Sequence, residues 1–324
     1  MRYFKKILYN LIFPIMKFIV VVFFNLKKTK LRTLFYSSLK HVDSLQYFCI
    51  DTDSETFLVD LDDQEIGKSL FSEGLFDFDK LLLAQDIIKS KNQNFESKTL
   101  IDIGANIGTI SIPAIKRGVF KNVVAFEPNP KNLKLLKVNL ILNNIEDKFK
   151  VYQAAVGDKD TLLDMELSDE NSGDHRIIVS DSNGMFNESN RKKIQISSIK
   201  LDSVLTELNS LTTLIWVDVQ GYEGQVLMGA KNILQKKVPL VIEFWPYGLN
   251  RAGGLDMLNK SLSMYDGFYD LSKPDIFYDI NQLSFYYEKI GIDGDFVDLL
   301  ILNLSCFRVL SPHNKNSRFT IFKN

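Results

Sequence analysis

The chain contains few of the residues that bind metals or form the disulfide bonds of small folds. Its 324 residues include two cysteines, Cys49 and Cys306, and three histidines, His41, His175 and His313, all far apart in the sequence. Two thiols cannot form a disulfide framework or a multi-thiolate metal site, and scattered histidines argue against a histidine-rich one. We therefore expect no thiolate or histidine metal site, and nothing in the spacing demands the alternative of Mg²⁺ on Asp218 and neighbouring carboxylates. We expect both cysteines to be small buried groups in a reducing compartment.

The chain also lacks an excess of charge of one sign, with a net charge of −1. This balance is uneven, because residues 1–42 carry nine Lys or Arg and no acid, which leaves a balance of −10 on the rest. A general nucleic-acid binder presents a basic face to phosphates, so nucleic acid is not an expected partner. Apolar residues make up 45% of the chain, which fits an α/β domain with additions and excludes global disorder.

No long uninterrupted apolar run is present. The run from Ile7 to Phe24 is about as long as a membrane-spanning helix, but it contains Asn10, Pro14 and Lys17 and is flanked by lysines. No small-residue cleavage site follows it, which disfavours a secretory signal. Residues 1–36 are interpreted either as a helix on an anionic membrane surface or as a helix packed on the body. We expect a cytoplasmic protein, with the inner membrane face as its alternative location.

The body begins with a hairpin pattern and a helical pattern. Two short apolar runs within residues 46–61 flank a turn-prone stretch, and residues 76–90 have helical spacing. The predicted units are therefore a basic apolar segment at 1–42, a hairpin and helix at 43–97, a catalytic domain at 98–310 and a tail at 311–324.

From residue 98 onward, short apolar runs alternate with amphipathic helices, which indicates a mostly parallel sheet covered by helices on both faces. One predicted helix, 131–144, has Asn129 as a cap and Pro130 in its first turn. A polar stretch at about 160–200 is interpreted as an inserted hairpin or loop module. The aromatic-rich stretch 265–295 either stacks on a sugar or packs against the sheet edge. The predicted strands are TLIDI (99–103), VVAFE (123–127), VYQAAV (151–156), LIWVDV (214–219), LVIEFW (240–245) and FVDLLILNL (296–304).

The first of these strands leads into a glycine-containing turn. Gly104, Asn106 and Gly108 suit the close backbone approach and the left-handed conformations of a strand-to-helix loop. The dinucleotide pattern G-x-G-x-x-G is incomplete here. An acid at the mouth of the loop, Asp102, and a second acid ending the next strand, Glu127, suit a nucleoside with a cationic amino-acid tail, such as S-adenosylmethionine.

Residues 99–245 resemble the FkbM-type family of S-adenosylmethionine-dependent methyltransferases. The resemblance lies in the segments IDIGANIGTIS, VVAFEPNPKNLKLLKVNL, AAVGDKD, NSGDHRI, IKLDSVL, WVDVQGYEGQVLMGA and PLVIEFWP. It implies a Rossmann-like class I methyltransferase fold with a seven-stranded sheet, preceded here by a helix and hairpin. It also implies that Asp102, Gly104, Asn106 and Gly108 cradle the methionine part of the cofactor, Glu127 its ribose, and Asp158 the adenine edge.

Three further residues are candidate bases for methyl transfer to a hydroxyl. Asp218 and Glu243 follow or end later strands, and His175 has the pKa suited to neutral pH. Asp174 would orient His175, and Arg176 would hold an anionic group, unless this run is a solvated loop. Glu223 either serves the site or caps its helix.

The sequence thus predicts an S-adenosylmethionine-dependent O-methyltransferase. As the resemblance implies, its acceptor is a hydroxyl on a sugar, glycolipid or secondary metabolite, either a small molecule or linked to a glycan or lipid. By resemblance to other methyltransferases, amino-group methylation of bases would place an Asn/Asp-Pro-Pro-aromatic run where this chain has Asp-Val-Gln-Gly. The alternatives are an NAD-dependent oxidoreductase and a non-catalytic membrane-associated binding protein.

Overall fold

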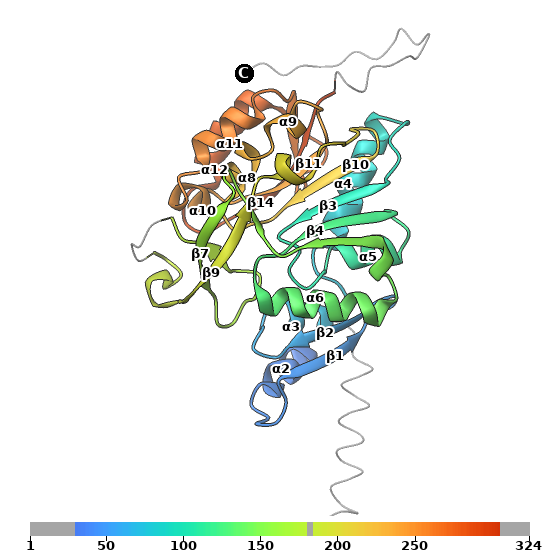
Figure 1. Ribbon diagram of the computed structural model, residues 1–324, viewed down its shortest axis with the longest axis vertical. Helices are drawn as coiled ribbons and strands as arrows, with labels where there is room; N and C mark the ends of the chain where they lie inside the picture. Colours follow the sequence, from blue (N-terminus) through green and yellow to red (C-terminus); the bar gives the residue numbers. More distant parts are fainter. Residues whose placement is uncertain (1–29, 180–183, 305–324) are drawn as a thin grey trace, which may run out of the picture.

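A computed structural model describes residues 30–179 and 184–304. It contains three sheets, and the largest is an eight-stranded sheet whose strand order is β13-β12-β14-β11-β10-β3-β4-β5 (Figure 1). Its strands are β3 (Thr99–Ile103), β4 (Asn122–Phe126), β5 (Phe149–Tyr152), β10 (Thr213–Val217), β11 (Leu240–Phe244), β12 (Gly267–Asp270), β13 (Phe277–Asp279) and β14 (Val297–Leu302).

The central strands of this sheet are parallel, as predicted. β5, β4, β3, β10 and β11 run in one direction, whereas β14 lies antiparallel between β11 and β12. The expected strand count of seven was wrong, because the short strand β13 adds an eighth at the edge among the described residues. The strand order reverses between β3 and β10, and such a switch point is where open α/β sheets bind ligands.

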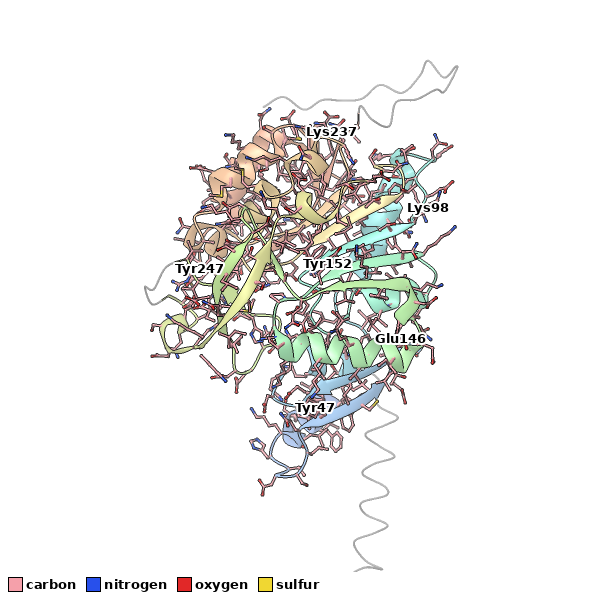
Figure 2. The ribbon with its side chains drawn as sticks, in the orientation of Figure 1. Tyr47, Lys98, Glu146, Tyr152, Lys237 and Tyr247 are labelled. Carbon is pink, nitrogen blue, oxygen red and sulfur yellow. The ribbon has the colours of Figure 1, made fainter. Side chains whose placement is uncertain are left out.

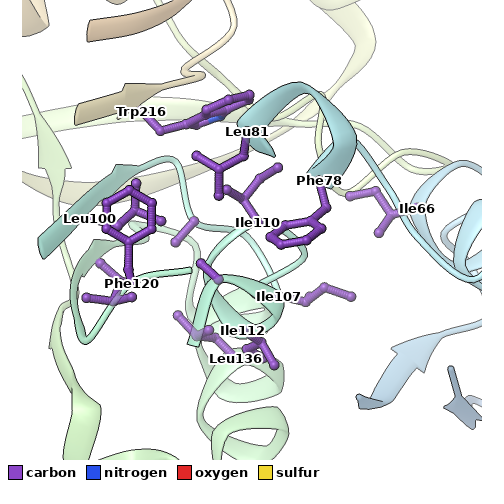
Figure 3. Packing of buried hydrophobic residues seen from close by; sticks show 14 of the residues in the cluster. Ile66, Phe78, Leu81, Leu100, Ile107, Ile110, Ile112, Phe120, Leu136 and Trp216 are labelled. Atoms are coloured by element: carbon purple, nitrogen blue, oxygen red, sulfur yellow. The ribbon is translucent and has the colours of Figure 1, made fainter. Parts of the chain in front are cut away.

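Helices cover both faces of the sheet. Leu100 and Leu214 face a core shared with the helices on one side, whereas Ile101 and Ile215 face the other core, as the period of two of a strand requires. On the first face are α3 (Ile66–Glu73), α4 (Phe78–Lys91), α5 (Ser111–Lys116) and α6 (Pro130–Asn143). On the second face are α7 (Leu201–Val204), α8 (Glu223–Met228), α9 (Lys231–Leu234), α10 (Pro246–Arg251), α11 (Leu255–Leu262) and α12 (Leu283–Ile290). Figure 3 shows the first core, where Leu100 and Trp216 of the sheet lie near Leu81 of α4.

The predicted hairpin is confirmed as the antiparallel pair β1 (Tyr47–Asp51) and β2 (Thr56–Asp60). It lies beside α6, below that helix in Figure 1. The side chains of Asn139 and Asn143 on α6 accept hydrogen bonds from the backbone of β2, at 2.7 and 3.0 Å. The predicted cap of α6 is also confirmed, because the Asn129 side chain accepts from two backbone amides of its first turn. Cys49 is exposed on β1, so the expectation that it is buried was wrong.

The predicted strand 151–156 divides between two sheets. Its first part is β5, and its second part, β6 (Ala155–Val156), pairs with β9 (Lys192–Ile199). β9 also pairs antiparallel with β7 (Thr161–Leu167), to which β8 (Arg176–Ile177) is added. Residues 161–199 therefore contain an antiparallel hairpin, one of the two alternatives for this stretch.

The basic N-terminal segment falls largely on residues 1–29, which lie outside the described residues. The helix that follows, α2 (Lys30–Leu39), packs against α3, and its Tyr36 side chain is fully buried with the hydroxyl donating to the backbone of Asp63. The body thus begins earlier than the predicted boundary at residue 42. None of the described helices is long and apolar enough to span a membrane.

Candidate active site

The loop after β3 approaches the end of β10 very closely. Gly104 and Gly108 have φ values of 92° and 96°, and Asn106 has a φ of 50°, so the loop uses the left-handed conformations that its sequence favours. A Cβ atom on Gly104 would overlap the backbone carbonyl oxygen of Asp218. Only glycine therefore permits this contact between the two strand ends.

Glu127 follows β4 directly and holds the same loop. Its Oε2 accepts a hydrogen bond from the Asn106 amide at 2.8 Å, and its Oε1 accepts one from the Asn129 amide at 2.7 Å. The side chain is 4% exposed, and burial raises its pKa to about 7, although the two amides favour the charged form. Each carboxylate oxygen retains a second acceptor position for a ligand.

A first cavity, of about 50 Å³, opens beside Glu127. Its walls come from the loop after β3, the end of β4, β6 and the inserted hairpin. They include Gly104, Asn106, Phe126, Glu127, Asn132, Ala154, Ala155, Val156, Ser172, Gly173, His175, Asp218, Gln220 and Tyr222. Asp158, which we expected at the adenine edge, is not among the residues that line the first cavity. The cavity is lined instead by Ala154 to Val156, a few positions earlier in the sequence.

A second cavity, of about 160 Å³, adjoins the first. The two share Gly104, Asn106, Gly173, Asp218 and Gln220. The second cavity brings together three predicted site residues from three neighbouring strand ends, Asp102, Asp218 and Glu243. The sheet topology thus places Asp102 in the same cavity wall as two acids that lie more than 100 positions later in the sequence.

Asp102 is the most isolated of these acids. It is 1% exposed, and its Oδ2 atom has no hydrogen-bond partner among the described residues. Burial raises its pKa to about 7, the nearby Ser111 hydroxyl opposes this increase, and the Asp218 carboxylate adds to it. A buried carboxylate oxygen without a partner is costly, which is expected where a ligand supplies the missing donor.

Asp218 and Glu243 are joined by the side chain of Gln220. The Gln220 Nε2 atom donates to Asp218 Oδ1 and to Glu243 Oε2, both at 2.8 Å. Burial raises the pKa of Asp218 to about 7, and burial together with the charge of Asp218 raises that of Glu243 well above its usual range. One carboxylate of the pair therefore ionises readily near neutral pH while the other keeps its proton.

This geometry agrees with comparisons to known proteins. A family model described as the methyltransferase FkbM domain matches residues 102–260. Residues 102–260, just under half of the chain, are therefore similar to the FkbM methyltransferase domain. The chain is 24% identical to methyltransferase sdnD of Sordaria araneosa over 65% of this chain and 83% of that protein. It is 33% identical to a putative protein N5-glutamine methyltransferase of Methanocaldococcus jannaschii over 26% of this chain and 42% of that protein.

Among solved structures, methyltransferase FkbM of Methylobacillus flagellatus matches 63% of this chain at 19% identity, with a TM-score of 0.37. This chain covers 43% of that protein, less than half of its length.

In this FkbM domain, Glu223 closes the loop after β10. Its Oε1 accepts from the backbone amides of Val219 and Gly221, at 3.1 and 3.2 Å. The side chain is fully buried, and burial raises its pKa to about 8. This is not the expected helix cap, because α8 has no side-chain cap; Glu223 instead holds the loop that precedes the helix.

His175 lines the first cavity of the FkbM domain, but its geometry argues against a role as a base. Its Nδ1 atom accepts a hydrogen bond from the Ser168 amide at 3.1 Å, so the neutral ring carries its proton on Nε2. Neither nitrogen then has a free lone pair. Desolvation lowers the pKa of His175 to about 4, which keeps the ring neutral.

Arg176 does not hold a substrate anion, contrary to one of our expectations. Its guanidinium lies between the rings of Phe186 and Trp245 and pairs with Asp174 and Glu188. The hydroxyl of Tyr247, at the left of the body in Figure 2, donates to the same Glu188 carboxylate at 2.6 Å. Trp245 and Tyr247, the two aromatic residues that follow β11, therefore pack together with Arg176 and hold the inserted hairpin in place.

Three further groups belong to the site but escaped sequence reasoning. Lys80 on α4 places its ammonium 2.6 Å from Asp298 and 2.7 Å from Asp77, and all three residues line the second cavity. Helical spacing gave no sign that Lys80 points to the sheet rather than to solvent. Ser172 and Gln220 lie within the family-like segments NSGDHRI and WVDVQGYEG, which is the one signal that marked them.

Proposed function

We propose that this FkbM methyltransferase uses S-adenosylmethionine to methylate a hydroxyl oxygen on a sugar, glycolipid or secondary metabolite. The observation that carries the proposal is the meeting of two cavities at Gly104 and Asp218. One cavity offers a nucleoside-type site beside Glu127, and the other offers paired carboxylates of raised pKa.

The residues present fit this cofactor. The loop backbone comes too close to Asp218 for any side chain on Gly104, which suits a ligand that lies against the backbone. The unpartnered Oδ2 of Asp102 suits an ammonium group, and the second acceptor positions of Glu127 suit a ribose diol. S-adenosylmethionine has both groups and supplies a methyl group activated on a sulfonium.

The chain's own residues would orient the acceptor and take its proton. Gln220 engages Oδ1 of Asp218, which leaves Oδ2 to accept the proton of the acceptor hydroxyl as the oxygen bonds to the methyl carbon. The pKa of Asp218, about 7, suits a base that works near neutral pH. Glu243 would keep its proton and hold the amide of Gln220 in place.

Calorimetric titration of the full chain with S-adenosylhomocysteine, and separately with NAD⁺, tests the cofactor class. We expect heat with the former and none with the latter, and the reverse would favour an oxidoreductase. Asp218→Asn should then lose turnover in a label-transfer assay while it binds S-adenosylhomocysteine normally. Asp256→Asn, an exposed change of the same chemistry on α11, is the matched control.

For location, we propose that the basic apolar segment contacts an anionic membrane surface. The alternation of lysines with Phe, Leu and Ile between residues 2 and 30 supports this proposal. The full chain and a chain lacking residues 1–29 would be sedimented with phosphatidylserine vesicles. The shortened chain keeps the buried Tyr36, so loss of sedimentation with retained S-adenosylhomocysteine binding would support the proposal.

A further inference from the structure

A short segment of the inserted hairpin, residues 171–173, forms part of the wall of both cavities. Ser172 and Gly173 line the first cavity, and Asn171 and Gly173 line the second. The segment lies between β7 and β8, and the described residues 168–175 belong to no strand. Because strand pairing does not fix the backbone in this described stretch, its position depends on contacts with distant parts of the chain.

The main contact comes from Asp63, which lies between β2 and α3 in the N-terminal unit (residues 30–73). Its Oδ2 atom accepts hydrogen bonds from the Ser172 amide, at 3.1 Å, and from the Ser172 hydroxyl. Its Oδ1 atom accepts from the backbone amides of Glu65 and Ile66, at 2.9 and 2.7 Å, where α3 begins. Asp63 is 5% exposed. One buried carboxylate therefore joins the N-terminal unit to the wall of the two cavities.

The segment that Asp63 holds contacts the loop after β3. Ser172 Oγ lies 3.4 Å from Oδ1 of Asn106, and the Asn106 amide donates to Glu127 Oε2 at 2.8 Å. A second contact comes from Asn132 of α6, whose Nδ2 atom donates to the Ser172 carbonyl at 3.0 Å. Asp63 and Asn132 together set the position of Ser172, and this position limits the space beside the loop.

We infer that Asp63 is a positioning residue for the cofactor. Through Ser172 it holds residues 171–173 against the loop after β3, so cofactor binding does not have to order this segment. Asp63 lies outside residues 102–260, which match the methyltransferase FkbM domain, so the N-terminal unit supplies a contact that the matched residues do not contain. The inference rests on the proposed function, because it assumes that the two cavities take S-adenosylmethionine.

The variant Asp63→Asn separates the two sides of the carboxylate. The remaining side-chain oxygen can still accept from the amides of Glu65 and Ile66, whereas the new NH2 group faces the Ser172 amide, so one donor meets another. The start of α3 is kept and the hydrogen bond to the Ser172 amide is lost. In calorimetry, S-adenosylhomocysteine should bind about tenfold more weakly, because a hydrogen bond to a charged group is removed. An unchanged Kd in a folded variant would overturn the inference.

Asp270→Asn is the matched control, because Asp270 also accepts from the amide and the hydroxyl of one serine, Ser272, at 2.8 and 2.6 Å. Both of these described residues lie outside the walls of the two cavities. Both variants should lower Tm, but Asp63→Asn alone should weaken the binding of S-adenosylhomocysteine. If the two variants weaken binding equally, general destabilisation explains the loss and the inference is wrong.

A double-variant cycle tests the route through Ser172. Ser172→Ala removes the hydroxyl and keeps the backbone amide, so it should weaken binding less than Asp63→Asn does. The double variant Asp63→Asn, Ser172→Ala should bind like Asp63→Asn alone, because the hydroxyl contact can be lost only once. Losses that multiply would show that the two residues act independently, which contradicts the inference.

Two further outcomes are informative. If Asp63→Asn does not fold, Ser172→Ala carries the test: a loss of about threefold in affinity supports the inference, and an unchanged Kd refutes it. If the unaltered chain does not bind S-adenosylhomocysteine, the proposed function is refuted instead.

Discussion

Replacing Gln220 by asparagine should move the pH dependence of turnover without removing a titrating group. Gln220 has a φ of 56°, and asparagine is the residue besides glycine that tolerates this conformation best. The shorter amide cannot span from Asp218 to Glu243, so at least one of the two 2.8 Å hydrogen bonds is lost. The substitution therefore removes an interaction and adds little backbone strain.

The size of the effect follows from the bond that is lost. A hydrogen bond to a charged group contributes about 1.5–3 kcal/mol, and about 1.4 kcal/mol corresponds to one pKa unit. Because Gln220 stabilises the ionised form of Asp218, its loss raises that pKa from about 7 by roughly one unit. The ionised fraction at pH 7 then falls from about one half to about a tenth, and kcat falls about fivefold.

The assay is the initial rate of methyl transfer between pH 6 and 9.5 with saturating S-adenosylmethionine. The acid limb of the kcat profile should shift upward by about one unit, and the rate should recover above pH 9. Gln235→Asn, the same change at an exposed position after α9, should leave the profile in place. A uniform loss of kcat at every pH, with the acid limb unmoved, would refute the assignment of Asp218 as the base.

Other perturbations test neighbouring parts of the site. Glu127→Gln should weaken S-adenosylhomocysteine at least about tenfold in calorimetry, because the ribose loses a charge-assisted partner; unchanged affinity would exclude the ribose role. Gly104→Ala should abolish that binding and lower Tm, because the new Cβ overlaps the Asp218 carbonyl; a variant that still binds would contradict the close approach. Glu188→Ala removes one of the two carboxylates that pair with the buried Arg176 and should cost about 1.5–3 kcal/mol in urea unfolding, because Asp174 still compensates the charge; a loss below about 0.5 kcal/mol would show that the pair is not buried as described. The raised pKa values of the buried acids mean that the folded state binds more protons than the unfolded one between pH 4 and 7, so stability is lost as pH rises through about 7. Tm of the ligand-free protein should therefore be higher at pH 5 than at pH 8.5, and a rising Tm would refute the burial of these acids.

Much of the fold could be predicted because the sequence patterns of single strands and helices match the elements that the whole fold contains. The strand TLIDI lies at Thr99–Ile103 as predicted, and Asn129 with Pro130 begins α6 as their capping chemistry requires. The strand 151–156 was predicted as one element, but it crosses from one sheet to another. Continuous apolar character cannot show this, since the two halves of the run pair with strands of different sheets.

The site could be predicted for residues that lie at the carboxyl ends of strands, because the sheet topology brings those ends together. Asp102, Asp218 and Glu243 meet because parallel strands end at one edge. His175 and Arg176 were misjudged because their partners, the Ser168 amide and the Glu188 carboxylate, come from tertiary packing of the inserted hairpin. The aromatic stretch after residue 265 forms the edge of the sheet itself, as β12 and β13, with Phe268 stacked on Tyr278, and periodicity alone did not show this.

The position of β14 has a consequence for how the protein is made. This strand comes last among the described strands, yet it lies between β11 and β12 and carries Asp298 into the second cavity. During synthesis, the earlier strands of the sheet emerge from the ribosome before the strand that joins its two parts. The second cavity is therefore completed only after residue 302 has left the ribosome. A nonsense mutation shortly before that codon removes an interior strand of the sheet rather than an edge strand.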